Sequence, residues 1–293
     1  MSSVFVEIKG RYPQMNEAMQ KIADYVLANG DEIAYQKAGE FADKSGVSAA
    51  SVSRFVKLLG YKNFNEFQLK LAASNDRSTK EEESVAGELA YNGKIVGKTT
   101  KEICQTIFSR GIRVIEETWG ILDFEVVEQV AEKIDTANRI VVIGVGRSKL
   151  TTQAIVSRLY RIGYNIIDYS DSHEIVNVTS IIKPGDLLIA VSNFGQSKAV
   201  VEGAKRAKKN GADVVGITSV TDSPLAKAAD HILLSAYDYA SDKMGRLYEP
   251  SAENAAQFIL VDCLYMIVAM KHEKENMERY RLFSEEIESE HVK

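Results

Sequence analysis

A stretch from Asp186 to Gly211 constrains the fold more than any other part of this sequence. Its apolar run, Leu187 to Val191, has the length and composition of a parallel strand that is buried on both faces. The residues after Ser197 place small apolar side chains on one helical stripe and lysines on the other, and Gly211 supplies a stop. The stretch therefore predicts a strand, a short loop and a helix that lies against a sheet.

The loop between this strand and this helix, Ser192 to Ser197, consists mostly of small and polar residues. Glycine lets a backbone approach a ligand closely, and the two serine hydroxyls can donate hydrogen bonds. A helix start also presents unpaired N–H groups and the positive end of the helix dipole. The loop therefore predicts an anion site, most simply for a phosphate. The alternative is that Ser192 satisfies the strand end and Ser197 caps the helix, without a ligand.

Strand and helix patterns alternate through the whole C-terminal half. The predicted strands cover residues 139–145, 164–168, 186–192, 214–218 and 231–234, and the predicted helices cover residues 123–137, 148–163, 172–182, the segment SPLAKAA and residues 255–271. Such alternation predicts a three-layer α/β sandwich with a five-stranded, mostly parallel sheet. Ligands of such sheets bind beyond the carboxyl ends of the strands.

A second glycine-rich loop, Gly144-Val145-Gly146-Arg147-Ser148, follows the first of these strands. It departs from the dinucleotide fingerprint GxGxxG, because neither Lys149 nor Leu150 is a glycine. Asp168, at the end of the second strand, keeps a ribose-binding role and thus a dinucleotide site open as an alternative. Two separate hydroxyl-bearing loops fit one compact phosphate better than a pyrophosphate.

The N-terminal part is predicted to be helical after an extended start. The predicted helices cover about residues 14–29, 31–35, 37–44, 48–59 and 65–73. The third and fourth are joined by the tight turn Ser45-Gly46-Val47, and Ser48 is suited to cap the fourth. Two short helices joined by a glycine-containing turn are typical of a helix-turn-helix.

The second helix of this pair carries small residues and cations on its predicted exposed face. After Ser48, this face comprises Ala49, Ala50, Ser51, Ser53, Arg54 and Lys57. Small residues let a helix enter a major groove deeply, and the cations can reach phosphate or guanine. The face therefore predicts a DNA contact, with a helical hairpin that has a solvated basic side as the alternative.

Composition narrows the class of protein. An apolar fraction of 45% over 293 residues is typical of a folded, two-domain chain, and a net charge of −5 excludes an indiscriminate nucleic-acid coat. The apolar runs are far shorter than the ~20 residues that span a bilayer, and the start lacks a signal-peptide pattern. Two distant cysteines predict neither a disulfide framework nor a metal site. These features predict a cytoplasmic protein with no membrane partner and no cofactor.

The predicted domains follow from these patterns. They are an all-α helix-turn-helix domain (1–77), a linker with a connecting helix at about residues 99–122 that Gly111 interrupts or bends (78–122), the α/β domain (123–275) and a charged tail (276–293).

The order of these motifs resembles that of the MurR/RpiR family of bacterial transcription regulators. The resemblance rests on AGEFADKSGVSAASVSRFVKLLGYKNFNEF followed by GVGRS, SNFGQS, GITS and SPLAKAAD, and it spans about Pro13 to Ala269. It implies a DNA-binding domain before a SIS (sugar isomerase) domain that senses a phosphosugar. By this resemblance Ser148, Ser192 and Ser197 hold the phosphate of the effector, and Ser51, Ser53, Arg54 and Lys57 lie on the DNA.

The expected effector site is wider than these three serines. It comprises Gly144, Gly146, Arg147, Ser148, His173, Ser192, Asn193, Gly195, Gln196, Ser197 and Glu253. One residue departs from the family pattern, since SIS domains usually read Ser-x-Ser-Gly-x-Thr/Ser and Phe194 takes the place of the middle serine. Phenylalanine donates no hydrogen bond, so the site has one phosphate ligand fewer or accepts a different anion.

Catalysis is the competing hypothesis. An aldose–ketose isomerase needs a base, and His173, Glu174 and Glu253 are the candidates. Because an acidic residue at a helix start is ordinary dipole compensation, these positions alone predict no active site. We therefore expect a sugar-phosphate-responsive regulator, acting on an operator as a homodimer or homotetramer, with a SIS-type isomerase or lyase as the alternative.

Overall fold

The computed structural model describes residues 4–12, 15–33, 36–75, 99–237 and 252–289. The chain divides into two compact units. The first, here called the helical unit, contains residues 1–121 and 235–256, and the second, the sheet unit, contains residues 122–234 and 257–293. The predicted domain boundaries stay a prediction.

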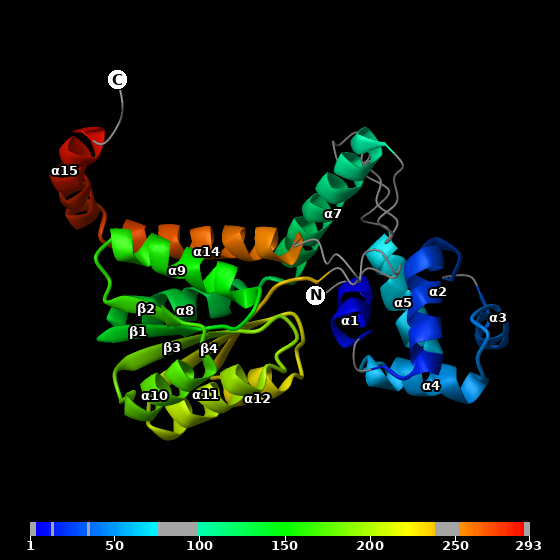
Figure 1. The fold of residues 1–293 in the computed structure, drawn as a ribbon. Helices are drawn as coiled ribbons and strands as arrows, with labels where there is room; N and C mark the ends of the chain where they lie inside the picture. The colour runs from blue at the N-terminus through cyan, green and yellow to red at the C-terminus, as the bar shows by residue number, and fades with distance from the viewer. Residues whose placement is uncertain (1–3, 13–14, 34–35, 76–98, 238–251, 290–293) are drawn as a thin grey trace. The chain divides into compact units, whose positions relative to one another are not determined.

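The helical unit begins with a bundle of short helices. They are α1 (Val4–Arg11), α2 (Glu17–Ile33), α3 (Ala38–Lys44), α4 (Ala49–Leu58) and α5 (Phe64–Asn75), and the longer α7 (Thr100–Ile121) follows (Figure 1). Asn29 leaves helical backbone angles and kinks α2, close to the predicted break. The expectation that Gly111 interrupts the connecting helix is wrong, since α7 runs through it with helical geometry. The predicted linker after Asn75 lies outside the described residues.

The predicted extended start is also wrong, because residues 4–11 form α1. The β-branched residues near the N-terminus favour an extended chain, but Val4, Ile8 and Tyr12 recur at helical spacing. All three are buried in the core of the bundle. The Arg11 guanidinium donates a hydrogen bond to the Leu58 carbonyl at the C-terminal end of α4. Tertiary packing therefore overrides the local preference for an extended chain, and α1 is hydrogen-bonded to the end of α4.

The helix-turn-helix is formed by α3, the turn at residues 45–47 and α4. Gly46 takes a left-handed φ of 67°, and the Val47 N–H donates to the Ala42 carbonyl, which closes the first helix. An aromatic cluster holds the pair together: the Phe67 ring on α5 lies 6.5 Å from that of Phe41 on α3 and 6.1 Å from that of Phe55 on α4.

The sheet unit confirms the predicted five-stranded parallel sheet. Its strands are β1 (Arg139–Ile143), β2 (Ile166–Tyr169), β3 (Asp186–Val191), β4 (Asp213–Thr218) and β5 (His231–Leu234), in the order β2-β1-β3-β4-β5. All neighbouring pairs are parallel, with Arg139 opposite Asp186 at the amino end of β1 and β3.

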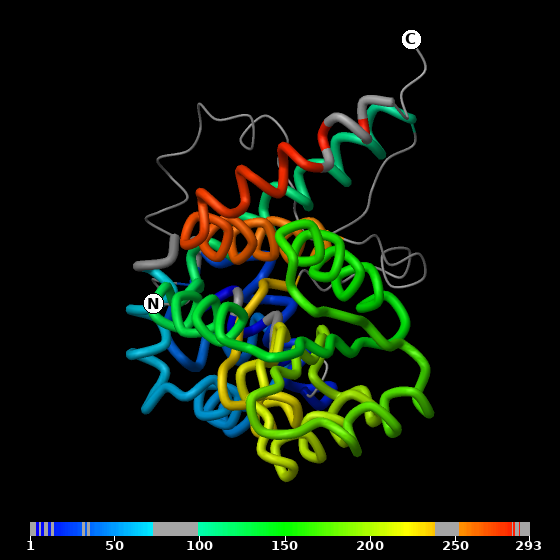
Figure 2. Tube along the Cα trace, turned by 90° about the vertical axis from the view of Figure 1, so that its left-hand side faces the viewer, coloured from blue at the N-terminus to red at the C-terminus, as the bar shows by residue number. Residues whose placement is uncertain are grey.

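Helices cover both faces of this sheet, as Figures 1 and 2 show. The face with Ile140 and Ile189 is covered by α8 (Phe124–Thr136), α9 (Ser148–Arg161) and the part of α14 (Ala252–Lys271) that belongs to the sheet unit. The face with Val141 and Leu188 is covered by α10 (Ser172–Ile181), α11 (Lys198–Lys209) and α12 (Pro224–Ala228). The chain continues into α15 (Glu273–Ser289), which begins three residues before the predicted charged tail and covers most of it.

One described helix, α14, is long and apolar enough to cross a membrane by length and composition alone. Its Leu260, Val261, Leu264 and Val268 side chains are buried in the core of the sheet unit. This burial is the arrangement of a core helix.

Replacing Phe67 by alanine should cost the helical unit about 3–5 kcal/mol of unfolding free energy, because the ring is fully buried among aromatic neighbours. Leu69→Ala, two residues along the same helix at a side chain that is 73% exposed, should change it by less than about 0.5 kcal/mol. Denaturant titration of both variants measures the difference. Equal losses would show that the cluster does not hold the bundle together.

Candidate effector and DNA sites

The two predicted anion loops follow the carboxyl ends of two neighbouring strands, β1 and β3. Strand β1 pairs with β2 on one side and with β3 on the other, so the chain order reverses between β1 and β3. The loop after β1 leads to α9 on one face, and the loop after β3 leads to α11 on the opposite face. Ligands of open α/β sheets bind at such a switch point, because the diverging connections leave a crevice there.

The helices that start at these two loops differ from their neighbours in capping. Among the helices that follow strands, α10 and α12 have their first N–H groups bonded by the side chains of Asp171 and Ser223. By contrast, α9 and α11 have no side-chain cap bond and no acidic residue in the first turn. No side-chain cap or first-turn acidic residue therefore compensates the positive dipole ends of α9 and α11, although the Lys149 and Leu150 N–H groups of α9 donate to the Gly146 and Arg147 carbonyls.

Asp171 shows the opposite arrangement at α10. Hydrogen bonds from the Glu174 and His173 backbone N–H groups hold the pKa of its carboxyl below the ordinary value. The carboxylate thus already occupies the place that an anionic ligand would take at this helix. His173 was expected in the effector site, and its exposed side chain follows this cap; its role there stays a prediction.

The loop after β3 is held in a defined shape. Ser192 donates its N–H to the Ile217 carbonyl, and Gly195 donates its N–H to the Ser192 carbonyl. Gly195 takes a φ of 62°, and a Cβ there would lie only 2.1 Å from Oγ of the buried Ser223. Only glycine therefore fits this turn.

The serines named for the effector site lie in or next to the two loops, with Ser148 as the first residue of α9. Ser192 and Ser148 are buried, and the Ser192 hydroxyl lies 3.4 Å from that of Ser197. Ser197 occupies the N-cap position of α11, yet its side chain makes no cap bond, so the capping alternative is wrong for its hydroxyl.

Of the other residues expected in the effector site, some lie in the two loops, and Glu253 lies in the other unit. Gly146 (φ 61°) and Arg147, the N-cap of α9, lie in the loop after β1, where a Cβ on Gly144 would meet Thr152 at 2.7 Å. Gln196 is exposed in the other loop. Glu253 belongs to the helical unit, and its effector role stays a prediction.

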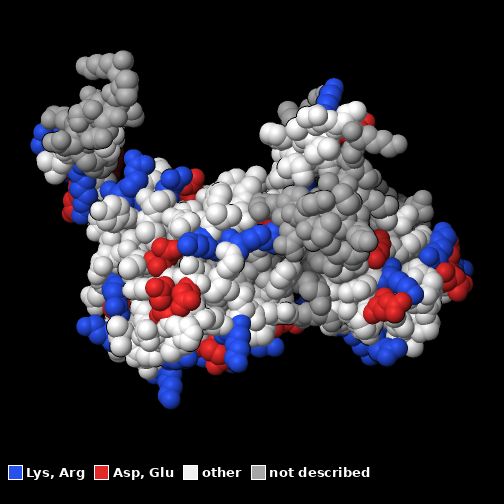
Figure 3. All heavy atoms as spheres, in the orientation of Figure 1, with Lys and Arg blue, Asp and Glu red and all other residues white. Residues whose placement is uncertain are grey.

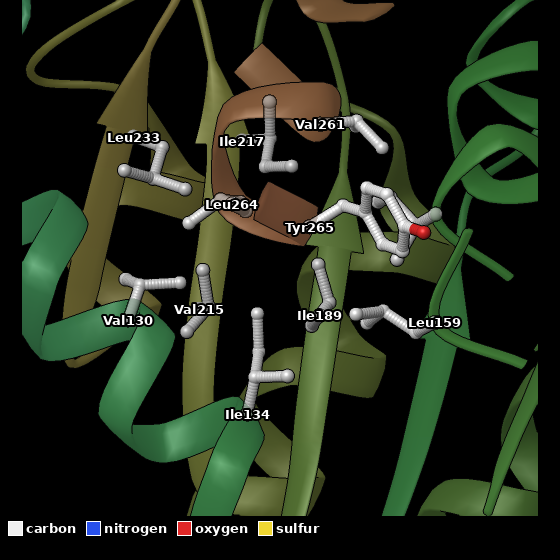
Figure 4. A pocket seen from close by; sticks show the side chains of 11 residues that line it. Val130, Ile134, Leu159, Ile189, Val215, Ile217, Leu233, Val261, Leu264 and Tyr265 are labelled. Atoms are coloured by element: carbon white, nitrogen blue, oxygen red, sulfur yellow. The ribbon is translucent and has the colours of Figure 1, made fainter. Parts of the chain in front are cut away.

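Two hollows of the sheet unit lie away from the two predicted anion loops. One is a gap in the apolar core beneath α14, whose lining residues include Ile134, Ile189 and Tyr265 (Figure 4). The space for water centres in it is about 10 Å³, so its apolar walls leave room for at most one water.

The other hollow, with about 250 Å³ of space on the same measure, lies at the amino end of the sheet between Tyr164, His272 and Arg279. Its polar groups bond one another: the Asp135 carboxylate accepts from the Tyr164 hydroxyl and pairs with His272, each at 2.6 Å. Burial acts to raise the pKa of Asp135, but these two bonds and the nearby cations hold it below its ordinary value. The hollow is therefore an internally satisfied contact between α15 and the rest of the unit.

The predicted DNA helix is confirmed as a helix but not in every residue of its exposed face. Ser48 caps α4 by accepting from the Ser51 N–H, as predicted. Ser51 itself is 8% exposed, and its hydroxyl lies 3.0 Å from that of Ser48, so its assignment to the exposed face is wrong. The reason is its place beside Val52 and Phe55 on the buried side of the helix.

The other members of this face are exposed. They are Ser48, Ala49, Ala50, Ser53, Arg54 and Lys57. No acidic residue occurs in α4, and Figure 3 shows Lys and Arg atoms on the surface over this helix. A helix with short side chains and cations on its exposed side has the shape and charge for a DNA groove.

Comparison with known proteins matches both units. Residues 3–78 match the helix-turn-helix domain of the rpiR family, and residues 133–267 match the SIS domain. The chain is 30% identical over 287 residues to an uncharacterised HTH-type transcriptional regulator of Thermotoga maritima, with 97% of this chain and 99% of that relative covered. The chain belongs to the RpiR family of transcriptional regulators.

Solved structures share the fold of this RpiR-family regulator. The NanR protein of Vibrio vulnificus complexed with ManNAc-6P has a TM-score of 0.60 at 24% identity, covering 99% of this chain and 100% of that chain. The sugar isomerase domain of an RpiR transcription factor from Sphaerobacter thermophilus has a TM-score of 0.57 at 20% identity, covering 63% and 99%.

Sequence patterns missed several residues that shape the site of this RpiR-family regulator. Thr218 donates its hydroxyl to the Asn193 carbonyl, and Gln257 bonds the Asn193 side chain from α14. The motif GITS contains Thr218 and was a usable signal, whereas Gln257 lies in an ordinary apolar helix. Asp168, the possible ribose ligand of the dinucleotide alternative, accepts a hydrogen bond from Thr152.

A pair of glycine substitutions tests whether the loop after β3 depends on close contact. Gly146→Ala should cost about 1–2 kcal/mol of unfolding free energy, because its φ is left-handed but its Cβ would meet open space. Gly195→Ala has the same backbone strain and adds the clash with Ser223, so it should cost clearly more. Thermal unfolding measures both, and equal losses would contradict the close packing.

Proposed function

We propose that this RpiR-family regulator senses a phosphorylated sugar in the crevice between the β1–α9 and β3–α11 loops. The observation that carries the proposal is the pair of helix starts without side-chain caps, α9 and α11, on opposite sides of the switch point. The phosphate would receive N–H groups from both helices and hydroxyls from Ser148, Ser192 and Ser197. The complex of the NanR relative with ManNAc-6P supports this class of effector.

Phe194 is the residue most suited to set the choice of effector. Its partly buried side chain stands where the family pattern has a serine, between the buried Ser192 and Asn193 and the tight turn at Gly195. An aromatic ring there removes one donor and narrows the crevice. We therefore propose that the sugar of this regulator differs from that of relatives with the serine.

Ser148→Ala and Ser197→Ala should each weaken sugar-phosphate binding by roughly tenfold to a hundredfold, because a hydrogen bond to a charged group contributes about 1.5–3 kcal/mol. A thermal-shift panel of hexose and amino-sugar 6-phosphates, including N-acetylmannosamine 6-phosphate, first identifies the ligand that stabilises the protein. Titration with that sugar phosphate then compares the variants.

Ser157→Ala provides the matched control, since Ser157 lies on the exposed side of the same helix as Ser148 and bonds only within that helix. It should bind like the wild type. Stabilisation that is equal in all three variants would place the ligand outside the two loops.

The alternative function is isomerisation or lysis of a sugar phosphate, since a putative sugar-phosphate isomerase of Listeria monocytogenes shares the fold. The candidate bases in the sheet unit, His173 and Glu174, are exposed at the start of α10. Turnover of the stabilising sugar phosphate that Glu174→Gln abolishes would favour the enzyme over the sensor.

We further propose that α4 binds an operator in double-stranded DNA. Arg54→Ala should weaken operator binding by about 1–3 kcal/mol if the guanidinium reads a guanine, or reduce the salt slope by about one if it contacts a phosphate. Lys21→Ala is the control, because this exposed lysine on α2 pairs with Glu17. Unchanged operator affinity and salt slope for Arg54→Ala in a gel-shift series would contradict the assignment.

At least a dimer is expected on the operator, because one helix-turn-helix reads only a few base pairs. The sheet unit offers a surface for a second copy, since Ile259, Met266 and Met270 of α14 are 45%, 51% and 71% exposed. A row of exposed apolar side chains on one helix is a usual mark of an interface. We propose a cytoplasmic homodimer or homotetramer with no membrane partner.

A further inference from the structure

A buried polar residue of α14, Gln257, connects the two anion loops of the sheet unit. Its side chain is 0% exposed. Its Nε2 donates to Oδ1 of Asn193 at 2.8 Å, and its Oε1 accepts from the Thr151 hydroxyl at 2.6 Å. Asn193 lies in the loop after β3, and Thr151 lies in the first turn of α9, three residues after Ser148. One side chain therefore contacts both sides of the crevice.

The backbone of Asn193 is also hydrogen-bonded, on the side of β4. Its backbone carbonyl accepts from the Ser219 N–H at 2.7 Å and from the Thr218 hydroxyl at 3.1 Å, both at the end of β4. All the side chains concerned are at most 8% exposed. Water does not readily replace a partner at such depth, so a shift of the loop would leave a buried polar group unsatisfied.

We propose that Gln257 is a positioning residue for the effector site: it sets the separation of the two loops so that Ser148 and Ser197 can reach one phosphate. This inference rests on the proposed sensing of a sugar phosphate. The amide suits the task because its oxygen accepts from Thr151 while its NH2 group donates to Asn193. An apolar residue of the same length fills the space but holds neither loop.

The test uses Gln257→Met in the full-length protein. Methionine keeps the length and packing of the side chain and removes both hydrogen bonds. The matched control is Val261→Ala, one helical turn further along α14, because Val261 is a buried core residue with no part in the polar chain. Both variants should lower the stability of the protein. A loss of exchange protection that is confined to the two loops in Gln257→Met therefore distinguishes a positioning role from a general loss of stability.

Hydrogen exchange without any ligand gives the first readout. Gln257→Met should speed exchange in peptides covering residues 190–199 and 217–222 relative to the wild type, since the Ser219 and Gly195 N–H bonds depend on the loop geometry. Val261→Ala should leave these peptides no faster than the rest of the sheet unit. Equal exchange of the loops in the two variants would overturn the proposal.

Titration with N-acetylmannosamine 6-phosphate and with inorganic phosphate gives the second readout. Gln257→Met should bind about tenfold or more weakly than the wild type, and Val261→Ala within about threefold, because misplaced groups lose most of their contribution. Wild-type affinity in Gln257→Met would overturn the positioning role. If the wild type binds neither probe while its loops exchange as expected, the proposed effector class fails and the loop-holding role of Gln257 stands.

Discussion

Parallel pairing of β1 with β3 is the constraint on which the effector end of this protein depends. Because the chain visits β2 before it returns to β3, the connections after β1 and β3 leave on opposite faces of the sheet. An ion pair at the amino end supports this pairing, since the partly exposed Arg139 guanidinium donates to the buried Asp186 carboxylate at 2.6 Å. This divergence marks the carboxyl ends of β1 and β3 as the switch point at which open α/β sheets usually bind ligands.

The helices that follow the strands differ in whether a side chain caps their first turn. Asp171 and Ser223 complete the starts of α10 and α12 from within the protein. The helices that follow β1 and β3, α9 and α11, lack such side-chain caps and first-turn acidic residues, so their positive dipole ends are not compensated in this way. In the helical unit, the aromatic cluster around Phe67 fixes the orientation of α4. It packs against the buried side of this helix, so the small and basic residues of α4 stay on the surface.

The elements that sequence patterns predicted best are those whose environment is uniform along their length. The central strands β1, β3 and β4, which are buried on both faces, have mostly apolar sequences. Their predicted bounds lie within about two residues of those observed. The predictions failed where a distant contact decides the outcome. Residues 4–11 form a helix because the bundle buries Val4 and Ile8. Ser51 lies inward because it shares the buried side of α4 with Val52 and Phe55.

The sequence by itself determined the order of the elements, the helix-turn-helix, the parallel sheet and the two glycine-containing loops, since periodicity and turn residues are local properties. Only the tertiary structure decided which helix starts lack caps and how the loops are held in register. Gln257 shows the physical reason: its partners Asn193 and Thr151 lie 64 and 106 residues away along the chain, and no local pattern records such a contact.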